Sequence, residues 1–154
     1  MQNHDSDLAQ SWVPPRRDRV RDHTAYPVNQ RIDELTRASV SSSLEGGRDV
    51  IQRRLAELDT EWDVDRALMV NFAVAGAVSS SLGFTRYLSS SPFGPRRKGF
   101  LYLFGAQLGF LLLHGTLGWC PPVAVFRRLG YRTKAEIDSE RALLERALER
   151  DAPS

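Results

Sequence analysis

Two stretches of this chain, 67–85 and 100–119, are long, apolar and predicted to cross a membrane. The polar side chains within them are the first candidates for chemistry. His114 and Gln107 are seven residues apart, so a helix would place them on one face, and Asn71 lies in the other stretch. Polar groups at membrane depth need hydrogen-bond partners, so we expect all three to face protein. A proton, metal or haem site at His114 is the functional interpretation. An interhelical hydrogen bond is favoured, because neither stretch holds a second histidine or a carboxylate, and a metal site needs three or four ligands.

Cys120 is the chain's one cysteine, which excludes an intramolecular disulfide. It precedes two prolines, and its functional interpretations are a reactive thiol, a persulfide carrier or a haem-regulatory Cys-Pro pair. The simpler interpretation is a small apolar residue at a helix end. We favour it because the motif itself supplies no basic group to activate the thiol. Cys120 stays the candidate functional thiol of an alternative function, a redox or sulfur-handling membrane accessory.

Catalytic and nucleotide-binding motifs are absent from the sequence. There is no GxGxxG, GxxxxGK[ST], GxSxG or HExxH, and the three histidines are too scattered to suggest a triad. The net charge of +2 gives no indication of a nucleic-acid binder. We therefore expect a protein that is not an enzyme and that holds no cofactor or metal.

The charges of the chain are strongly segregated. It has 21 basic and 19 acidic residues, yet none falls in 67–85 or 100–119. Each stretch approaches the roughly 20 residues that cross about 30 Å of hydrocarbon. The second is rich in Phe and Leu and ends at Trp119, a residue typical of the headgroup level. The first is only moderately hydrophobic, so a soluble helical bundle with both stretches as its core is a further alternative.

Small residues recur at four-residue spacing in both predicted spans, an arrangement that lets helix backbones approach closely in lipid. The candidate packing residues are Ala73, Gly76, Ala77, Gly105 and Gly109. They suggest a homo-oligomer, with a dimer favoured, although low bulk alone would give the same pattern.

Outside the spans, the sequence predicts amphipathic helices. We expect a disordered tail over 1–26, a helical segment over 27–66, an interfacial turn over 120–132 and a C-terminal helix over 133–150. An apolar stripe of Ile51, Leu55, Leu58 and Trp62 marks the segment before the first span. We expect this helix to pair with the C-terminal helix, nearly antiparallel, and these helices to recruit a protein partner.

Two short patterns support these boundaries and the orientation. Thr133-Lys134-Ala135-Glu136 is a capping-box sequence that starts the C-terminal helix. Near the spans, eight basic residues lie on the side of the termini and four lie in the connector, which favours cytoplasmic termini. The N-terminus lacks a basic region followed by an apolar one, so we expect no cleavable signal peptide, and the hairpin itself would direct insertion.

The stretch from Gly115 to Leu144 resembles the end of the YgaP-like transmembrane family, a bacterial inner-membrane domain of unknown function. The resemblance rests on Gly118-Trp119-Cys120-Pro121, a Gly-x-Cys-Pro motif, and on the segment 54–63 before the first span. The resemblance implies a bacterial inner-membrane protein that is dimeric through its hairpins. Some relatives carry a rhodanese sulfurtransferase domain, which this sequence lacks, so that activity is not implied here. We expect an all-α fold, a two-helix transmembrane hairpin with flanking cytoplasmic amphipathic helices in the bacterial inner membrane.

Overall fold

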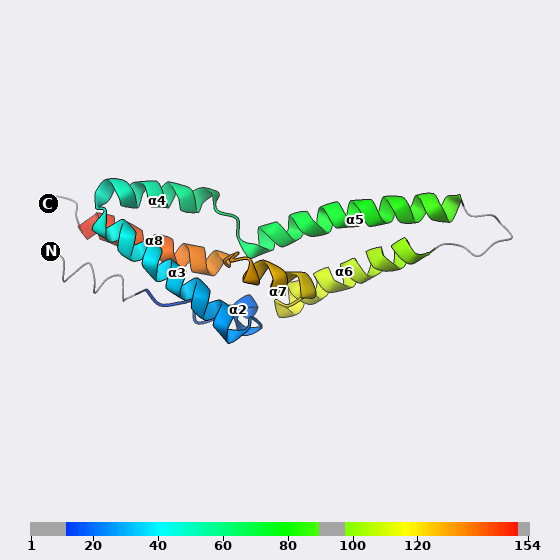
Figure 1. The fold of residues 1–154 in the computed structure, drawn as a ribbon, viewed down its shortest axis with the longest axis horizontal. Coiled ribbons are helices and arrows are strands. Elements are labelled where there is room, and N and C mark those ends of the chain that lie inside the picture. The colour runs from blue at the N-terminus through cyan, green and yellow to red at the C-terminus, as the bar shows by residue number, and fades with distance from the viewer. Residues whose placement is uncertain (1–11, 90–97, 151–154) are drawn as a thin grey trace.

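The computed structural model describes residues 12–89 and 98–150, and these residues confirm the all-α class (Figure 1). The described part of the chain contains helices and connecting loops but no strand. In chain order the helices are α2 (Arg19–Asp22), α3 (Tyr26–Glu45), α4 (Arg48–Thr60), α5 (Val64–Leu88), α6 (Gly99–Leu117), α7 (Pro121–Arg128) and α8 (Lys134–Arg150).

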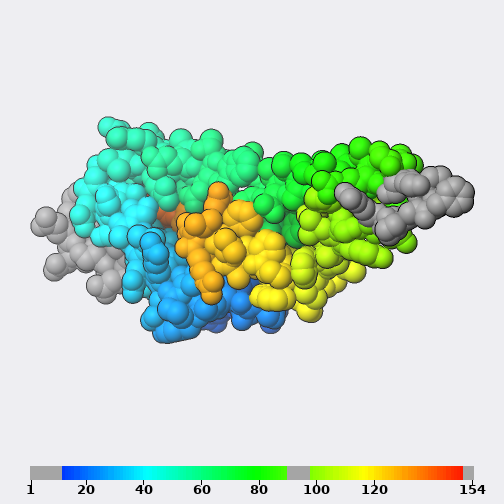
Figure 2. All heavy atoms as spheres, turned by 45° about the vertical axis from the view of Figure 1, so that its right-hand side comes forward, coloured from blue at the N-terminus to red at the C-terminus, as the bar shows by residue number. Residues whose placement is uncertain are grey.

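Helices α5 and α6 lie side by side and project as an arm from the remaining helices (Figure 1). The space-filling view shows the same elongated shape, with the α5 and α6 arm extending beyond the helical domain formed by α2, α3, α4, α7 and α8 (Figure 2). At 1.5 Å per residue, the 25 residues of α5 extend about 37 Å and the 19 of α6 about 28 Å. Both helices are long and apolar enough to cross a membrane.

The seam between α5 and α6 follows one row of α5. Phe72, Gly76, Ser79 and Gly83 recur at helical spacing, and all four are buried. A Cβ atom at Gly83 would lie 2.7 Å from Leu101 Cδ2, and one at Gly76 would lie 3.5 Å from Phe104. Glycine at these two positions lets the helices approach, as small residues do in membrane helix pairs.

The other faces of the arm are apolar and uncovered. No residue of α6 is buried, although its sequence is almost entirely apolar. Val74, Leu103 and Leu112 are among the exposed side chains, with Leu112 70% exposed. The two apolar helices therefore do not form a buried core within this chain.

Helices α3, α4 and α8 enclose the hydrophobic core of the helical domain. Its buried members are Trp12, Val40, Leu44, Ile51, Leu58, Ile137, Leu144 and Ala147, with Leu55 and Leu148 packed against them. Helices α4 and α8 run in opposite directions beside each other, which confirms their predicted pairing (Figure 1). Trp62 lies beyond the end of α4 and is exposed, so the predicted stripe contributes its first three residues to the core.

The predicted disordered tail over 1–26 is wrong for its second half. Trp12 is buried, and its Nε1–H donates to Ser139 Oγ at 3.0 Å. Val20 is buried in a second cluster beside Val64. Few side chains of this segment are apolar, but Trp12 and Val20 are inserted into the domain, and composition alone does not reveal that. The rest of the tail, 1–11, lies outside the described residues.

The predicted turn over 120–132 contains a helix. Pro121 and Pro122 occupy the first turn of α7, where a missing N–H leaves no hydrogen bond unmade. The helix continues to Arg128, and Gly130 has a positive φ of 97° directly after it. The two prolines therefore begin α7, whereas α6 already ends at Leu117.

Candidate functional site

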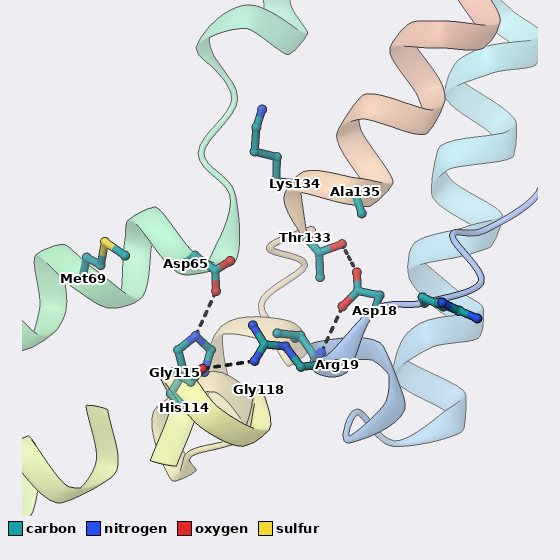
Figure 3. Close-up of a pocket in the computed structure, with 12 residues that line it drawn as sticks. Asp18, Arg19, Asp65, Met69, His114, Gly115, Gly118, Thr133, Lys134 and Ala135 are labelled. Atoms are coloured by element: carbon teal, nitrogen blue, oxygen red, sulfur yellow. Dashed lines mark hydrogen bonds and ion pairs between the residues drawn. The ribbon is translucent and has the colours of Figure 1, made fainter. Parts of the chain in front are cut away.

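A cavity of about 370 Å³ lies where the arm joins the helical domain (Figure 3). It brings together α2, the start of α5, the end of α6 and the start of α8. Its lining residues are Arg17, Asp18, Arg19, Val20, Asp65, Met69, His114, Gly115, Gly118, Thr133, Lys134 and Ala135. We call it the junction cavity. Of the residues predicted from the sequence to carry chemistry, it contains His114.

His114 faces Asp65 across this cavity (Figure 3). Its Nε2 lies 2.9 Å from Asp65 Oδ1, so Nε2 carries the hydrogen when the carboxyl group is ionised. The other ring nitrogen, Nδ1, is buried and has no hydrogen-bond partner among the described residues. The expected interhelical hydrogen bond of His114 is present, with a partner two residues outside the uncharged stretch.

Arg19 attaches α2 to the end of α6. Its Nη1 donates to the carbonyl oxygens of Gly115 and Thr116, both at 3.1 Å. These carbonyls belong to the last turn of α6, where a cation is favourable to the helix dipole. Gly118 ends the helix with φ of 75°, and a Cβ atom there would lie 2.9 Å from the backbone carbon of Arg19. Glycine therefore serves both the helix end and the close approach of α2.

Asp18 joins α2 to α8 through hydrogen bonds from neutral donors. Its Oδ1 accepts from the amides of Val20 and Arg21 at 2.9 and 3.1 Å, which caps α2. Its Oδ2 accepts from the hydroxyl of Thr133 (Figure 3). The carboxylate is thus a structural link rather than a free acid or base.

Behind the cavity, Glu136 is fully buried and surrounded by donors. Arg127 donates to it through Nη1 at 2.6 Å and Nη2 at 2.8 Å, and Arg21 also contacts it. The amide of Thr133 donates to it at 2.7 Å, and the amide of Glu136 donates to Thr133 Oγ1 at 3.2 Å, which confirms the capping box. Burial alone would raise the pKa of Glu136, but the two guanidinium groups and the amide outweigh it and lower the pKa.

One turn further along α8, Glu140 is equally buried. Arg54 donates to it through Nε at 2.9 Å and Nη2 at 3.2 Å, and Arg132 donates through Nη1. Ser39 Oγ completes its partners at 3.0 Å. Arg132 also forms two hydrogen bonds of 2.7 Å with Glu61. Burial would raise the pKa of Glu140, but these arginines hold it below its ordinary value.

These groups form two separate ion clusters, one around Glu136 and one around Glu140, and together we call them the ion network of the helical domain. Four arginines face four carboxylates, and the members are Arg21, Arg54, Arg127, Arg132, Asp33, Glu61, Glu136 and Glu140. The pKa values of Glu136 and Glu140 are lowered by their arginine partners, so neither buried carboxylate is suited to act as a general base. Sequence reasoning missed the network except for Glu136, which the capping box marks. The position of Glu140 one turn later, on the same face as Leu144, was a further signal.

Cys120 is buried at the start of α7, beside Val20 and Val64. Desolvation raises the pKa of its thiol, although a hydrogen bond from the amide of Val123 opposes the shift. A raised pKa lowers the fraction of thiolate, which is the nucleophilic form. The geometry is that of a small core residue and gives no support to a reactive thiol.

The two amide side chains predicted to lie at membrane depth, Gln107 and Asn71, differ in their surroundings. Ser79 Oγ donates to Gln107 Oε1 at 2.9 Å, an interhelical bond of the kind expected for Gln107. Asn71 is exposed on α5, so within a single chain the expectation that it faces protein is wrong. Its neighbours Val70 and Val74 are exposed as well, which leaves its amide on an uncovered face of the arm.

The predicted packing residues divide between the seam and open surface. Gly76 lies in the seam, whereas Ala73 and Ala77 are exposed beside it. They line a groove of about 350 Å³ between α5 and α6, together with Gln107. A Cβ atom added at Gly105 or Gly109 would have no neighbour within 4 Å. These two glycines are therefore not used in packing within the described part of the chain.

The described residues contain no group of three or more His, Cys, Asp or Glu side chains placed to hold a metal ion. Comparisons of the chain with family models, curated proteins and solved structures find no match.

Proposed function

We propose that the chain is an integral membrane protein whose helices α5 and α6 are its two spans. The observation that carries this proposal is the complete lack of buried residues in α6, a helix of 19 nearly apolar residues. In water, each exposed Leu or Phe side chain would forgo about 1.5–3 kcal/mol of burial free energy. Hydrocarbon removes that cost, and both helices satisfy their backbone hydrogen bonds internally, as lipid requires.

Extraction of the expressed chain from membranes tests this proposal. We expect it to stay in the membrane pellet after washing with alkaline carbonate and to dissolve only in detergent. Recovery in the aqueous fraction would support the soluble helical bundle and refute the membrane proposal.

The helical domain and both termini lie in the cytoplasm in this proposal, following the charge bias of the flanking residues. The native Cys120 is buried and should react little with an impermeant maleimide. Cysteines introduced one at a time therefore report which side of the membrane they face. A cysteine at Ser89 should react from outside intact bacterial cells stripped of their outer membrane. A cysteine at Glu149 should react only after lysis, and the reverse pattern would refute the orientation.

We further propose that the arm self-associates, with a dimer as the simplest assembly. Gln107 Oε1 is bonded to Ser79, but its NH2 group has no partner among the described residues. An unpaired amide donor is costly in hydrocarbon, and Gln107 lines the groove bordered by Ala73 and Ala77. A second copy would supply both the acceptor and apolar surface for the groove, and uncovered Gly105 and Gly109 offer a second close-contact face.

Small-to-large substitutions distinguish this dimer from a monomer. Ala77→Ile and Gly109→Ile should each lower the dimer fraction measured by energy transfer between labelled copies in vesicles. Ala106→Ile is the matched control, because Ala106 is exposed on α6 away from both faces. Equal energy transfer in all three variants and the wild type would refute the proposed interfaces.

We propose that the helical domain has no catalytic role and that the protein is a membrane module, which recruits a protein partner through the helices of this domain. Membership of the YgaP-like family is part of the same proposal. Gly118 and Cys120 have structural reasons for their positions, a helix end and a buried contact, which suits a motif kept for packing. A redox function through Cys120 predicts that Cys120→Ser changes sulfur or redox phenotypes, whereas the module proposed here predicts no change.

A further inference from the structure

The junction cavity has more cationic donors than its own acceptors use. Arg17 has no ion pair or hydrogen bond with another described residue. Arg19 uses only Nη1 in its bonds to the end of α6, which leaves Nε and Nη2 available. Lys134 is 73% exposed, and its one contact is a surface pair with Asp138 at 3.3 Å. The cavity therefore has Arg19 on the side of α2 and the start of α8 on another side, where the Lys134 side chain extends away from Arg19 (Figure 3).

The two carboxylates in the cavity form no ion pair with Arg17, Arg19 or Lys134. Asp18 is bonded to the α2 amides and to Thr133, and Asp65 is bonded to His114. The amides of Lys134 and Ala135, in the first turn of α8, have no partner in the described part of the chain. Unpaired amides at the start of a helix favour an anion, and here they add to the side-chain cations.

The position and walls of the cavity suit an amphipathic molecule. It opens where α5 begins and α6 ends, which is the headgroup level if these helices span a membrane. Met69 lines it and is 64% exposed, so an apolar wall leads from the cavity to the outward face of α5. Gly115 has no atom within 4 Å of an added Cβ, which leaves the end of α6 open beside the donors.

We propose that the junction cavity binds the phosphate headgroup of an anionic phospholipid from the leaflet that faces the helical domain. The phosphate accepts hydrogen bonds from Arg19 and the start of α8, Arg17 and Lys134 supply further positive charge, and an acyl chain follows α5 past Met69. This proposal rests on the membrane location proposed above. It adds one specific lipid-binding site to a protein whose spans are otherwise only solvated by the bilayer.

Lipid binding to the full-length protein in detergent tests the proposal. Native mass spectrometry would compare phosphatidylglycerol with phosphatidylcholine of the same acyl chains. The wild type should retain phosphatidylglycerol preferentially, and R17Q/K134Q should bind it about thirtyfold more weakly, from the contribution of two interfacial cations. Both side chains are exposed and make no core contact, so the variant should unfold at the wild-type temperature.

A control variant that loses the same number of positive charges distinguishes a specific lipid site in the junction cavity from general attraction between the protein and anionic lipid. R31Q/R128Q removes two exposed arginines that line a different cleft, between α3 and α7. It should keep wild-type binding. Equal weakening in the two double variants, or no preference for phosphatidylglycerol in the wild type, would overturn the proposal. Release of the lipid by equimolar inorganic phosphate would also overturn it, by showing a site for a free anion. Failure of membrane location would instead appear as recovery of the protein in carbonate washes.

Discussion

Glu140→Gln removes the buried charge that Arg54 and Arg132 share in one cluster of the ion network. Glu140 is fully buried, and it accepts from Arg54 at 2.9 Å and from Arg132. Without its charge, Arg54 retains partners only near the surface, and Arg132 retains Glu61. Breaking a buried ion pair by removing one partner costs about 3–5 kcal/mol. Because glutamine keeps one acceptor oxygen and Arg132 keeps a carboxylate, we expect the lower end, about 3 kcal/mol.

Urea unfolding in mild detergent measures this loss in the helical domain. Trp12 is a suitable probe, because its indole is buried against α8 and Arg37 lies 5.6 Å from its ring centre. Trp62→Phe and Trp119→Phe in the background would remove the other two indoles. The control is Glu145→Gln, a half-exposed carboxylate 3.8 Å from Arg141, for which we expect a change below about 0.5 kcal/mol.

A Glu140→Gln variant within about 0.5 kcal/mol of the wild type, the range of an ordinary surface substitution, would contradict the proposed contribution of Glu140 to stability. That outcome would mean that water reaches Arg54 and Arg132 and that the network contributes no more than an exposed ion pair. A large loss in the Glu145→Gln control would equally contradict the assignment of stability to buried pairs.

Three further predictions concern the domain and the arm. Acidification should destabilise the helical domain, because folding lowers the pKa values of Glu136 and Glu140 from 4.5. Their contribution to the free energy of unfolding is complete above pH 4.5 and is lost as the pH falls through the lower pKa values of the folded state. The urea midpoint measured as a function of pH checks this prediction. Gly118→Ala should destabilise the chain by about 1–2 kcal/mol in thermal unfolding, because φ is 75° and Arg19 lies against the added methyl group. Gly83→Ile should separate α5 from α6, seen as a longer distance between spin labels on the two helices, whereas Ala106→Ile should not.

The helical class and the arm were predictable because their signals are continuous along the chain. Nineteen and twenty successive uncharged residues mark α5 and α6, and the repeat of Ile51, Leu55 and Leu58 marks the core face of α4. Such patterns report one face of one helix. They predicted that α4 pairs with α8 because each needs an apolar partner.

The ion network was not predictable in the same way. Glu136 and Glu140 look like solvent-facing charges until their partners are known, and Arg54 lies 86 residues from Glu140. Asp65 was missed because it lies just before the uncharged stretch, although α5 begins at Val64 and brings it opposite His114. Only tertiary packing brings such distant charges together, and a single sequence carries no record of that packing.

Spin labels on the outward faces of the arm test the central claim most directly. Single cysteines at Val74, Leu103 and Leu112, all exposed and apolar in this chain, would be labelled and measured in vesicles. Oxygen, which concentrates in lipid, should relax these labels far more than a water-soluble nickel complex does. A label at Glu145 in the helical domain should show the opposite preference. Greater relaxation by nickel along α5 and α6 would show that water surrounds these faces and would contradict the account.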